Sequence, residues 1–168
     1  MTQLSIDGDD FILALQSNAS DGGQFYLNTE TGVVVMIYDG MVNGEDMDAD
    51  EIDALIEDGP LLEIDPIRSH ESFSIMEDFV DLLPAGEPKV RLHDALDGKG
   101  VFRRFKDRLF DYPDLRDEYH LFHEMAYRKM TLDWMNENEI QAKVTFRNPD
   151  AVEETGKSEA DSAGGKET

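Results

Sequence analysis

Five basic side chains and one acidic side chain occupy residues 99–109, the most basic stretch of the sequence. On a helix over residues 101–110, the arginines would lie opposite an apolar face. That face would consist of Phe102, Phe105 and Leu109. A Gly-Lys-Gly sequence precedes the helix, where exposed backbone N–H groups can hold a phosphate or a carboxylate. The candidate anion- or partner-binding residues are Lys99, Arg103, Arg104 and Arg108.

This basic cluster has two interpretations. In so acidic a chain, the bases are needed to pair with neighbouring carboxylates, and Gly-Lys-Gly is an ordinary turn between two helices. Alternatively, the cluster binds an anion, a nucleic acid or a protein partner. It is not a phosphate-binding P-loop, because that loop needs an earlier glycine and a following Ser or Thr.

An acidic stretch over residues 46–57 partly matches a calcium-binding EF-hand loop. Asp46, Asp48, Asp50 and Glu57 take positions 1, 3, 5 and 12 of that loop. However, Glu51 stands where the loop requires glycine for its sharp turn. A helix cap followed by acids in the first turn explains the same residues without a metal ion.

Histidines offer no stronger evidence for catalysis or metal binding. His120, His123 and Glu124 follow the order of neither known class of zinc protease, and we expect them on a polar, solvated helix face. The chain has no cysteine, which excludes disulfides, thiolate zinc sites and thiol nucleophiles. The sequence therefore predicts no catalytic residue, no metal site and no cofactor.

The periodicity of apolar residues and the positions of Gly and Pro predict the elements that hold these residues. We expect helices over residues 8–17, from 48 or 50 to 57, and over 69–83, 88–97, 101–110 and 114–137. We expect strands over residues 24–28, 33–38 and 61–64, and an edge strand within 140–146. The first two strands are joined by Thr-Glu-Thr-Gly, a short loop ending in glycine that is typical of a β-hairpin.

These elements predict an α+β fold. A small antiparallel sheet, made of the hairpin and a third strand, would have four or five helices packed on one side. We expect one domain over residues 1–147. Residues 148–168 have no apolar periodicity and are rich in Gly, Ser, Glu and Lys, so we expect them to form a disordered acidic tail.

The charge is large and unevenly placed. The net charge is −23, and residues 1–67 contain sixteen acids and no Lys or Arg. Such a field repels nucleic acids and anionic membranes at long range, and it attracts a basic partner. An excess of Asp over Glu with few lysines would also suit a host with a salty cytoplasm, so both explanations of the acidity stay open.

Neither a membrane span nor a signal peptide is apparent in the sequence. No stretch approaches about 18 continuous apolar residues. The N-terminal residues MTQLSIDGDDF lack a basic segment followed by an apolar one. We therefore expect a cytoplasmic location.

Four blocks of sequence occur together in a familiar order and spacing. They are YLNTETGVV at 26–34, IMEDF at 75–79, GKGVFRRFKD at 98–107 and WMNENEI at 134–140. In these blocks the chain resembles the bacterial uncharacterised protein family UPF0158. Lys99, Val101 and Glu139 replace the Arg, Ala and Gly that are usual there. The last replacement puts the expected helix end in doubt, because Glu resists the left-handed conformation that glycine adopts there.

The resemblance implies an architecture and no activity, because the function of that family is unassigned. The charge favours a non-enzymatic binding or regulatory module that meets a basic protein partner through its acidic N-terminal half. One alternative is an anion or nucleic-acid binder acting through the basic helix 99–108. A further alternative is an enzyme of unknown class, for which no pair of nucleophile and base is visible in the sequence.

Overall fold

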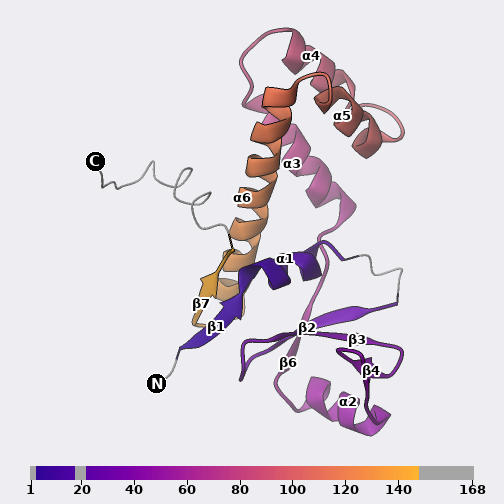
Figure 1. Ribbon diagram of the computed structural model, residues 1–168, viewed down its shortest axis with the longest axis vertical. Coiled ribbons are helices and arrows are strands. Elements are labelled where there is room, and N and C mark those ends of the chain that lie inside the picture. The colour runs from indigo at the N-terminus through magenta and orange to yellow at the C-terminus, as the bar shows by residue number, and fades with distance from the viewer. Residues whose placement is uncertain (1–2, 18–21, 148–168) are drawn as a thin grey trace, which may run out of the picture. The chain divides into compact units, whose positions relative to one another are not determined.

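The computed structural model describes residues 3–17 and 22–147 (Figure 1). The chain divides into two compact units: the first combines Met1–Pro66 with Tyr127–Thr168, and the second is Ile67–Ala126. Such units need not be separate domains, so one domain over residues 1–147 stays a prediction. The predicted tail, residues 148–168, lies outside the described residues.

The first unit contains a five-stranded antiparallel sheet with the order β5-β4-β3-β2-β6. Its strands are β2 (Gln24–Asn28), β3 (Val34–Tyr38), β4 (Met41–Val42), β5 (Glu45–Asp46) and β6 (Leu61–Ile64). The predicted hairpin is confirmed as β2 and β3, and the predicted third strand is β6, which pairs with β2. β4 and β5 were not predicted, because strands of two residues have no detectable periodicity.

Local hydrogen bonds explain the turn of the hairpin. The side-chain oxygen of Asn28 accepts hydrogen bonds from the backbone N–H groups of Glu30 (2.9 Å) and Thr31 (3.0 Å). Gly32 has a φ of +82°, and a Cβ there would collide with the carbonyl oxygen of Ser5. Glycine is therefore required at this position by both conformation and space.

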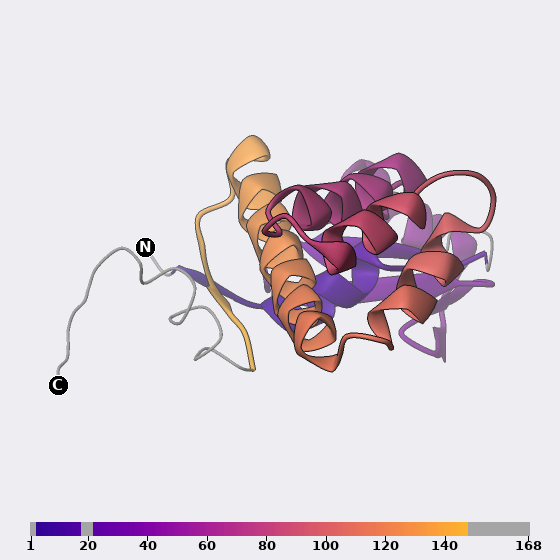
Figure 2. The ribbon, with the colours of Figure 1, turned by 90° about the horizontal axis from the view of Figure 1, so that it is seen from above.

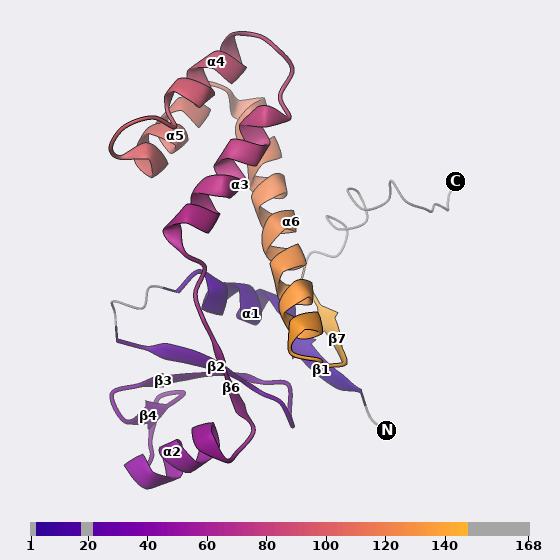
Figure 3. The same cartoon turned by 180° about the vertical axis from the view of Figure 1, so that it is seen from behind.

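Two helices of the first unit lie on opposite faces of this sheet (Figures 1 and 3). They are α1 (Gly8–Leu15) and α2 (Ala49–Glu57), capped by the side chains of Asp7 and Asp48. The apolar cluster beneath α2 includes Tyr26, Val35, Leu61, Leu55 and Ile56. The prediction placed the helices on one side. However, β3 has apolar residues on both of its faces, one of which contacts α1 while Val35 on the other packs with Leu55 and Ile56 of α2.

A second, two-stranded sheet joins distant parts of the sequence within the first unit. β1 (Leu4–Asp7) pairs in parallel with β7 (Ala142–Thr145), so that Leu4 lies opposite Ala142. β7 falls within the predicted edge strand, whereas β1 was not predicted. Its four residues are too few to separate a strand from the start of the following helix.

The second unit consists of helices (Figure 2, magenta to orange). They are α3 (Ser69–Asp81), α4 (Glu87–Asp94), α5 (Val101–Leu109) and the first part of α6 (Pro113–Glu137). The Tyr119 ring lies 5.2 Å from the Phe79 ring and 5.1 Å from the Phe105 ring, so aromatic contacts join α6 to α3 and α5. Within residues 3–17 and 22–147, each of the six predicted helices occurs where the sequence placed it, with ends that differ by up to three residues.

The last residues of α6 settle the doubt about Glu139. The backbone N–H of Ile140 donates to the Met135 carbonyl at 2.8 Å, and that of Glu139 donates to Asn136 at 3.1 Å. These two bonds form a Schellman motif, in which Glu139 adopts the left-handed conformation with a φ of +55°. The helix therefore ends where the family pattern has glycine, although glutamate stands there.

In the part of the chain that the structure describes, no helix combines the length and the apolar character needed to cross a membrane.

Candidate binding surfaces

The four candidate basic residues lie on α5 and on the turn before it, in the second unit. Gly98 and Gly100 have φ angles of +83° and +66°, so the two glycines form the turn between α4 and α5. The guanidinium of Arg104 folds back onto this turn: Nη2 donates to the carbonyl of Ala95 at 3.0 Å, and Nη1 contacts the carbonyl of Lys99. Arg104 therefore satisfies one carbonyl group at the end of α4 and one in the turn that follows it.

Arg108 has an internal partner as well. Its Nη1 lies 3.3 Å from a carboxylate oxygen of Asp111, and Nη2 of Arg91 lies 3.5 Å from the same oxygen. Arg91 also approaches Glu87 at 3.8 Å. Glu87 is mostly exposed and the other three side chains are nearly half exposed, so each pair contributes about 0–1 kcal/mol to stability.

Lys99 and Arg103 differ from the two paired arginines. Both residues are exposed, and within the described residues neither side chain forms an ion pair.

The apolar face of α5 departs from the prediction at one residue. Phe105 and Leu109 are buried, but Phe102 is 40% exposed.

Three arginines line a small hollow in the second unit. Its volume is about 320 Å³, and it is lined by Arg91, Asp94, Ala95, Arg104 and Arg108. Sequence reasoning missed Arg91, because only the turn between α4 and α5 brings this residue beside the basic helix. The hollow can receive a carboxylate or phosphate, but its arginines already bind Asp111 and two backbone carbonyls.

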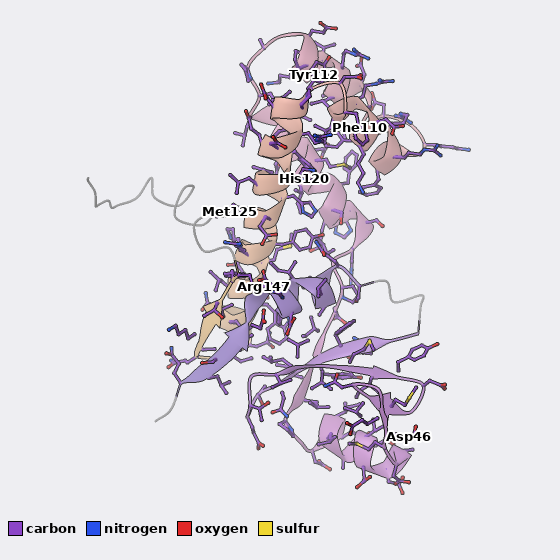
Figure 4. All side chains as sticks on the ribbon, viewed as in Figure 1. Asp46, Phe110, Tyr112, His120, Met125 and Arg147 are labelled. Carbon is purple, nitrogen blue, oxygen red and sulfur yellow. The ribbon has the colours of Figure 1, made fainter. Side chains whose placement is uncertain are left out.

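Eight carboxylates form what we call the acidic surface, on β5, α2 and the residues that adjoin them (Figure 4, near Asp46). They are Glu45, Asp46, Asp48, Asp50, Glu51, Asp53, Glu57 and Asp58. All eight residues are exposed, and none pairs with a basic side chain of the described residues.

The EF-hand-like residues belong to this acidic surface. Asp46 lies in β5, and Asp48 caps α2 by accepting a hydrogen bond from the backbone N–H of Asp50 at 3.2 Å. Glu57 is the last residue of α2. The cap explains this part of the pattern, and the described residues contain no group of three His, Asp or Glu side chains that could hold a metal ion.

Other acids of the first unit do have a basic partner. Nε of Arg147 lies 3.0 Å from Asp9, and its Nη2 lies 3.8 Å from Asp7 and 3.6 Å from Asp10 (Figure 4). The backbone N–H of Arg147 also donates to Asp9 at 2.7 Å. Arg147 thus pairs with the acids at the start of α1 and offsets part of their charge, whereas the acidic surface has no such partner.

An apolar groove lies between α1 and β3 in the first unit. Its volume is about 630 Å³, and its lining includes Leu13, Phe25, Val34, Met36 and Tyr38. Asp10, Ser17, Gly23 and Asn43 complete the lining. Sequence reasoning missed the groove, although the uninterrupted apolar run of β3, Val-Val-Met-Ile-Tyr, is the signal that both of its faces are apolar.

The two histidines of α6 lie in different environments. His120 is exposed, as expected (Figure 4). His123 is half-buried, with its ring 5.7 Å from that of Tyr119, so the expectation of a solvated side chain was wrong for this residue. Burial lowers the pKa of His123, and this effect outweighs the nearby negative charge of Glu124.

Comparisons with known proteins identify relatives without assigned activity. A sequence model described as an uncharacterised protein family, UPF0158, matches residues 3–154. A curated UPF0158 protein of Pseudomonas aeruginosa is 32% identical over 143 residues, which cover 84% of this chain and 88% of the relative. No solved structure matches the chain.

Proposed function

This chain belongs to the uncharacterised protein family UPF0158, and we propose that it is a binding module for a basic protein partner. The acidic surface over β5 and α2 is the proposed contact. The observation that carries the proposal is the absence of counter-charges: residues 22–66 hold twelve acids and no Lys or Arg, and no acid of the acidic surface pairs with a basic side chain of the described residues. A field of this sign attracts basic proteins and speeds their association.

The distribution of charge supports a specific partner over a general adaptation to salt. Residues 67–126 contain thirteen acids and nine bases, whereas residues 22–66 contain twelve acids and no base. An adaptation to a salty cytoplasm would act on every exposed surface of the protein. The concentration of unpaired acids in one unit favours a role for that unit in binding.

The spacing of the acids on α2 suits a protein segment as the ligand. Asp50, Asp53 and Glu57 follow one another at intervals of three and four residues, which places them along one helix face. Lysines or arginines along an extended or helical segment can meet such a row. A nucleic acid would be repelled by the same carboxylates.

The test is a titration of a fluorescein-labelled lysine-rich peptide, followed by fluorescence anisotropy at low salt. The test variant combines Asp50→Asn, Asp53→Asn and Glu57→Gln. The control variant carries the same charge change on α3, through Glu77→Gln, Asp78→Asn and Asp81→Asn, all at exposed positions.

We expect the α2 variant to bind the peptide at least about tenfold more weakly, and the α3 variant to change binding less than about twofold. Equal losses in the two variants would mean that only the overall charge matters. No detectable binding by the wild type would refute the proposed function.

The arginine hollow gives a second candidate, an anion site in the second unit. The observation that favours it is that three guanidinium groups line one hollow. Calorimetric titration with inorganic pyrophosphate tests it, with Arg108→Gln as the variant and Arg103→Gln as the control outside the hollow. Binding that is lost in Arg108→Gln alone would support this site, and no binding by the wild type would exclude it for this anion.

A further inference from the structure

The strand β3 has apolar side chains on both faces, although only one face is well buried by a helix. Val35 and Ile37 face α2 and pack in the cluster beneath it. Val34, Met36 and Tyr38 alternate with them and line the groove beside α1. An antiparallel strand with one solvated face normally alternates apolar and polar residues. A strand that is apolar on both faces therefore indicates that both faces are buried when the protein binds its partner.

The cover that α1 provides is incomplete. In the groove Leu13 is 59% exposed, Tyr38 is 45% exposed and Met36 is 37% exposed. Helix α1 has eight residues and buries Phe11, Ile12 and Leu15 on its other side. A cluster of exposed large apolar side chains around one hollow is a common feature of protein-binding sites.

Glycine keeps one end of the groove open. A Cβ at Gly23 would lie 3.8 Å from Sδ of Met36 and 3.8 Å from the ring of Tyr38, so a larger side chain there would extend into the groove. Asn43 borders the groove on the β4 side: its Oδ1 accepts a hydrogen bond from the backbone N–H of Met36 at 2.8 Å. The groove is thus apolar at its base and bounded by small or polar residues.

We infer that this groove receives a large apolar side chain, such as phenylalanine, carried by a basic segment of the partner protein. The inference rests on the proposed function, because charge complementarity identifies the occupant. The groove belongs to the same unit as the acidic surface, and Asp39 directly follows Tyr38 in its lining. Residues 22–66 contain no base that would repel a lysine-rich segment. Asp10 also lines the groove, but Arg147 already pairs with it at 3.6 Å.

Two other occupants fit less well. The chain's own residues 148–168 contain six acids, two bases, no aromatic residue and Val152 as their one large aliphatic residue. A second copy of this chain would bring another strongly acidic unit against the first. Both occupants would add negative charge to a unit that is already acidic, and the first offers almost no apolar surface to bury.

The experiment compares two fluorescein-labelled lysine peptides that differ at one central position, phenylalanine or serine. Anisotropy titrations use the full-length wild type and a Gly23→Leu variant, in which the new side chain fills the groove. Gly23→Ala is the matched control, since a methyl group makes only ordinary contacts there. Met36→Ser provides a second disruption, and Leu132→Ser removes an exposed apolar residue that does not line the groove.

We expect the wild type to bind the phenylalanine peptide about tenfold more tightly than the serine peptide, as burial of an aromatic ring predicts. Gly23→Leu and Met36→Ser should remove that preference and leave binding of the serine peptide unchanged. Gly23→Ala and Leu132→Ser should keep it.

The outcomes separate this inference from the proposed function. If both peptides bind the wild type equally, the groove does not receive the apolar side chain, while the acidic surface remains a binding site. If neither peptide binds, the proposed function fails first and the inference with it. Light scattering provides the last check: a wild-type dimer that Gly23→Leu converts to a monomer would identify a second copy as the occupant and overturn the inference.

Discussion

In residues 67–126, nine bases stand among thirteen acids. Three of the arginines bind Asp111 or backbone carbonyls: Arg91, Arg104 and Arg108. In residues 22–66, twelve acids have no basic side chain among them, and the acidic surface forms no ion pair within the described residues. The difference shows that the basic side chains of a cluster can be paired with acids and carbonyls of the same fold, while unpaired carboxylates stay available to a partner. The most basic stretch of the sequence is therefore a weaker candidate for binding than the acidic stretch.

We expect the largest change in stability from substituting Arg104, and almost no change from substituting its neighbour Arg103 in the second unit. Arg104→Gln removes donors from the carbonyls of Ala95 and Lys99, and we expect the free energy of unfolding to fall by about 1–2 kcal/mol. Arg103→Gln removes an exposed side chain that forms no ion pair within the described residues, and should change the free energy of unfolding by less than about 0.5 kcal/mol. Urea unfolding monitored by circular dichroism measures both. Equal losses would mean that the two arginines have the same role.

The first unit should respond to salt, because its like charges repel one another. Raising the salt concentration to about 1 M shortens the screening length to about 3 Å, so we expect the melting temperature to rise by a few degrees. This rise in melting temperature should be smaller in the Asp50→Asn, Asp53→Asn, Glu57→Gln variant. In the matched α3 variant it should equal that of the wild type. A flat salt profile for the wild type would contradict the view that these carboxylates repel one another.

One substitution in the first unit should stabilise the protein by relieving an unfavourable backbone conformation. Glu139 has a φ of +55°, which glycine adopts at lower cost, so Glu139→Gly should raise the free energy of unfolding by about 1 kcal/mol. Asn138→Gly is the control, since Asn138 does not have a positive φ. Thermal unfolding measures both variants. A loss of stability in Glu139→Gly would show that the glutamate side chain contributes more than its backbone conformation costs.

The smallest effect concerns pH and lies in the second unit. Burial places the pKa of His123 in the folded state below its unfolded value, so the unfolded state takes up the proton first as the pH falls. The free energy of unfolding should therefore decrease as the pH falls through about 6.5. His123→Gln should reduce this decrease, whereas His120→Gln, at an exposed position, should leave it in place. Identical pH profiles for wild type and His123→Gln would contradict this account.

The sequence predicted those elements whose signals are local and long enough to read. The hairpin follows from its short loop ending at Gly32, and the helices follow from apolar residues at helical spacing. The strands β4 and β5 escape such reasoning, since two residues show no alternation. The pairing of β1 with β7 joins residues about 138 positions apart, which no local pattern encodes.

The candidate sites show the same limit. Helical spacing placed the arginines of α5 on a polar side, but it could not say that Arg104 reaches the carbonyl of Ala95 while Arg103 forms no ion pair within the described residues. The apolar groove could have been found from the sequence. Five consecutive apolar residues in a strand of a small antiparallel sheet imply that both faces need cover.

The most direct test of the central claim is a nuclear magnetic resonance titration. Backbone amide spectra of the full-length protein are recorded while the lysine peptide with phenylalanine is added at low salt. We predict that the shifts concentrate on residues 45–58 and on the groove residues Leu13, Gly23, Met36 and Tyr38, and that they disappear as salt is raised. Shifts confined to residues 67–126, or no shifts at all, would contradict the proposal that the acidic first unit binds a basic partner.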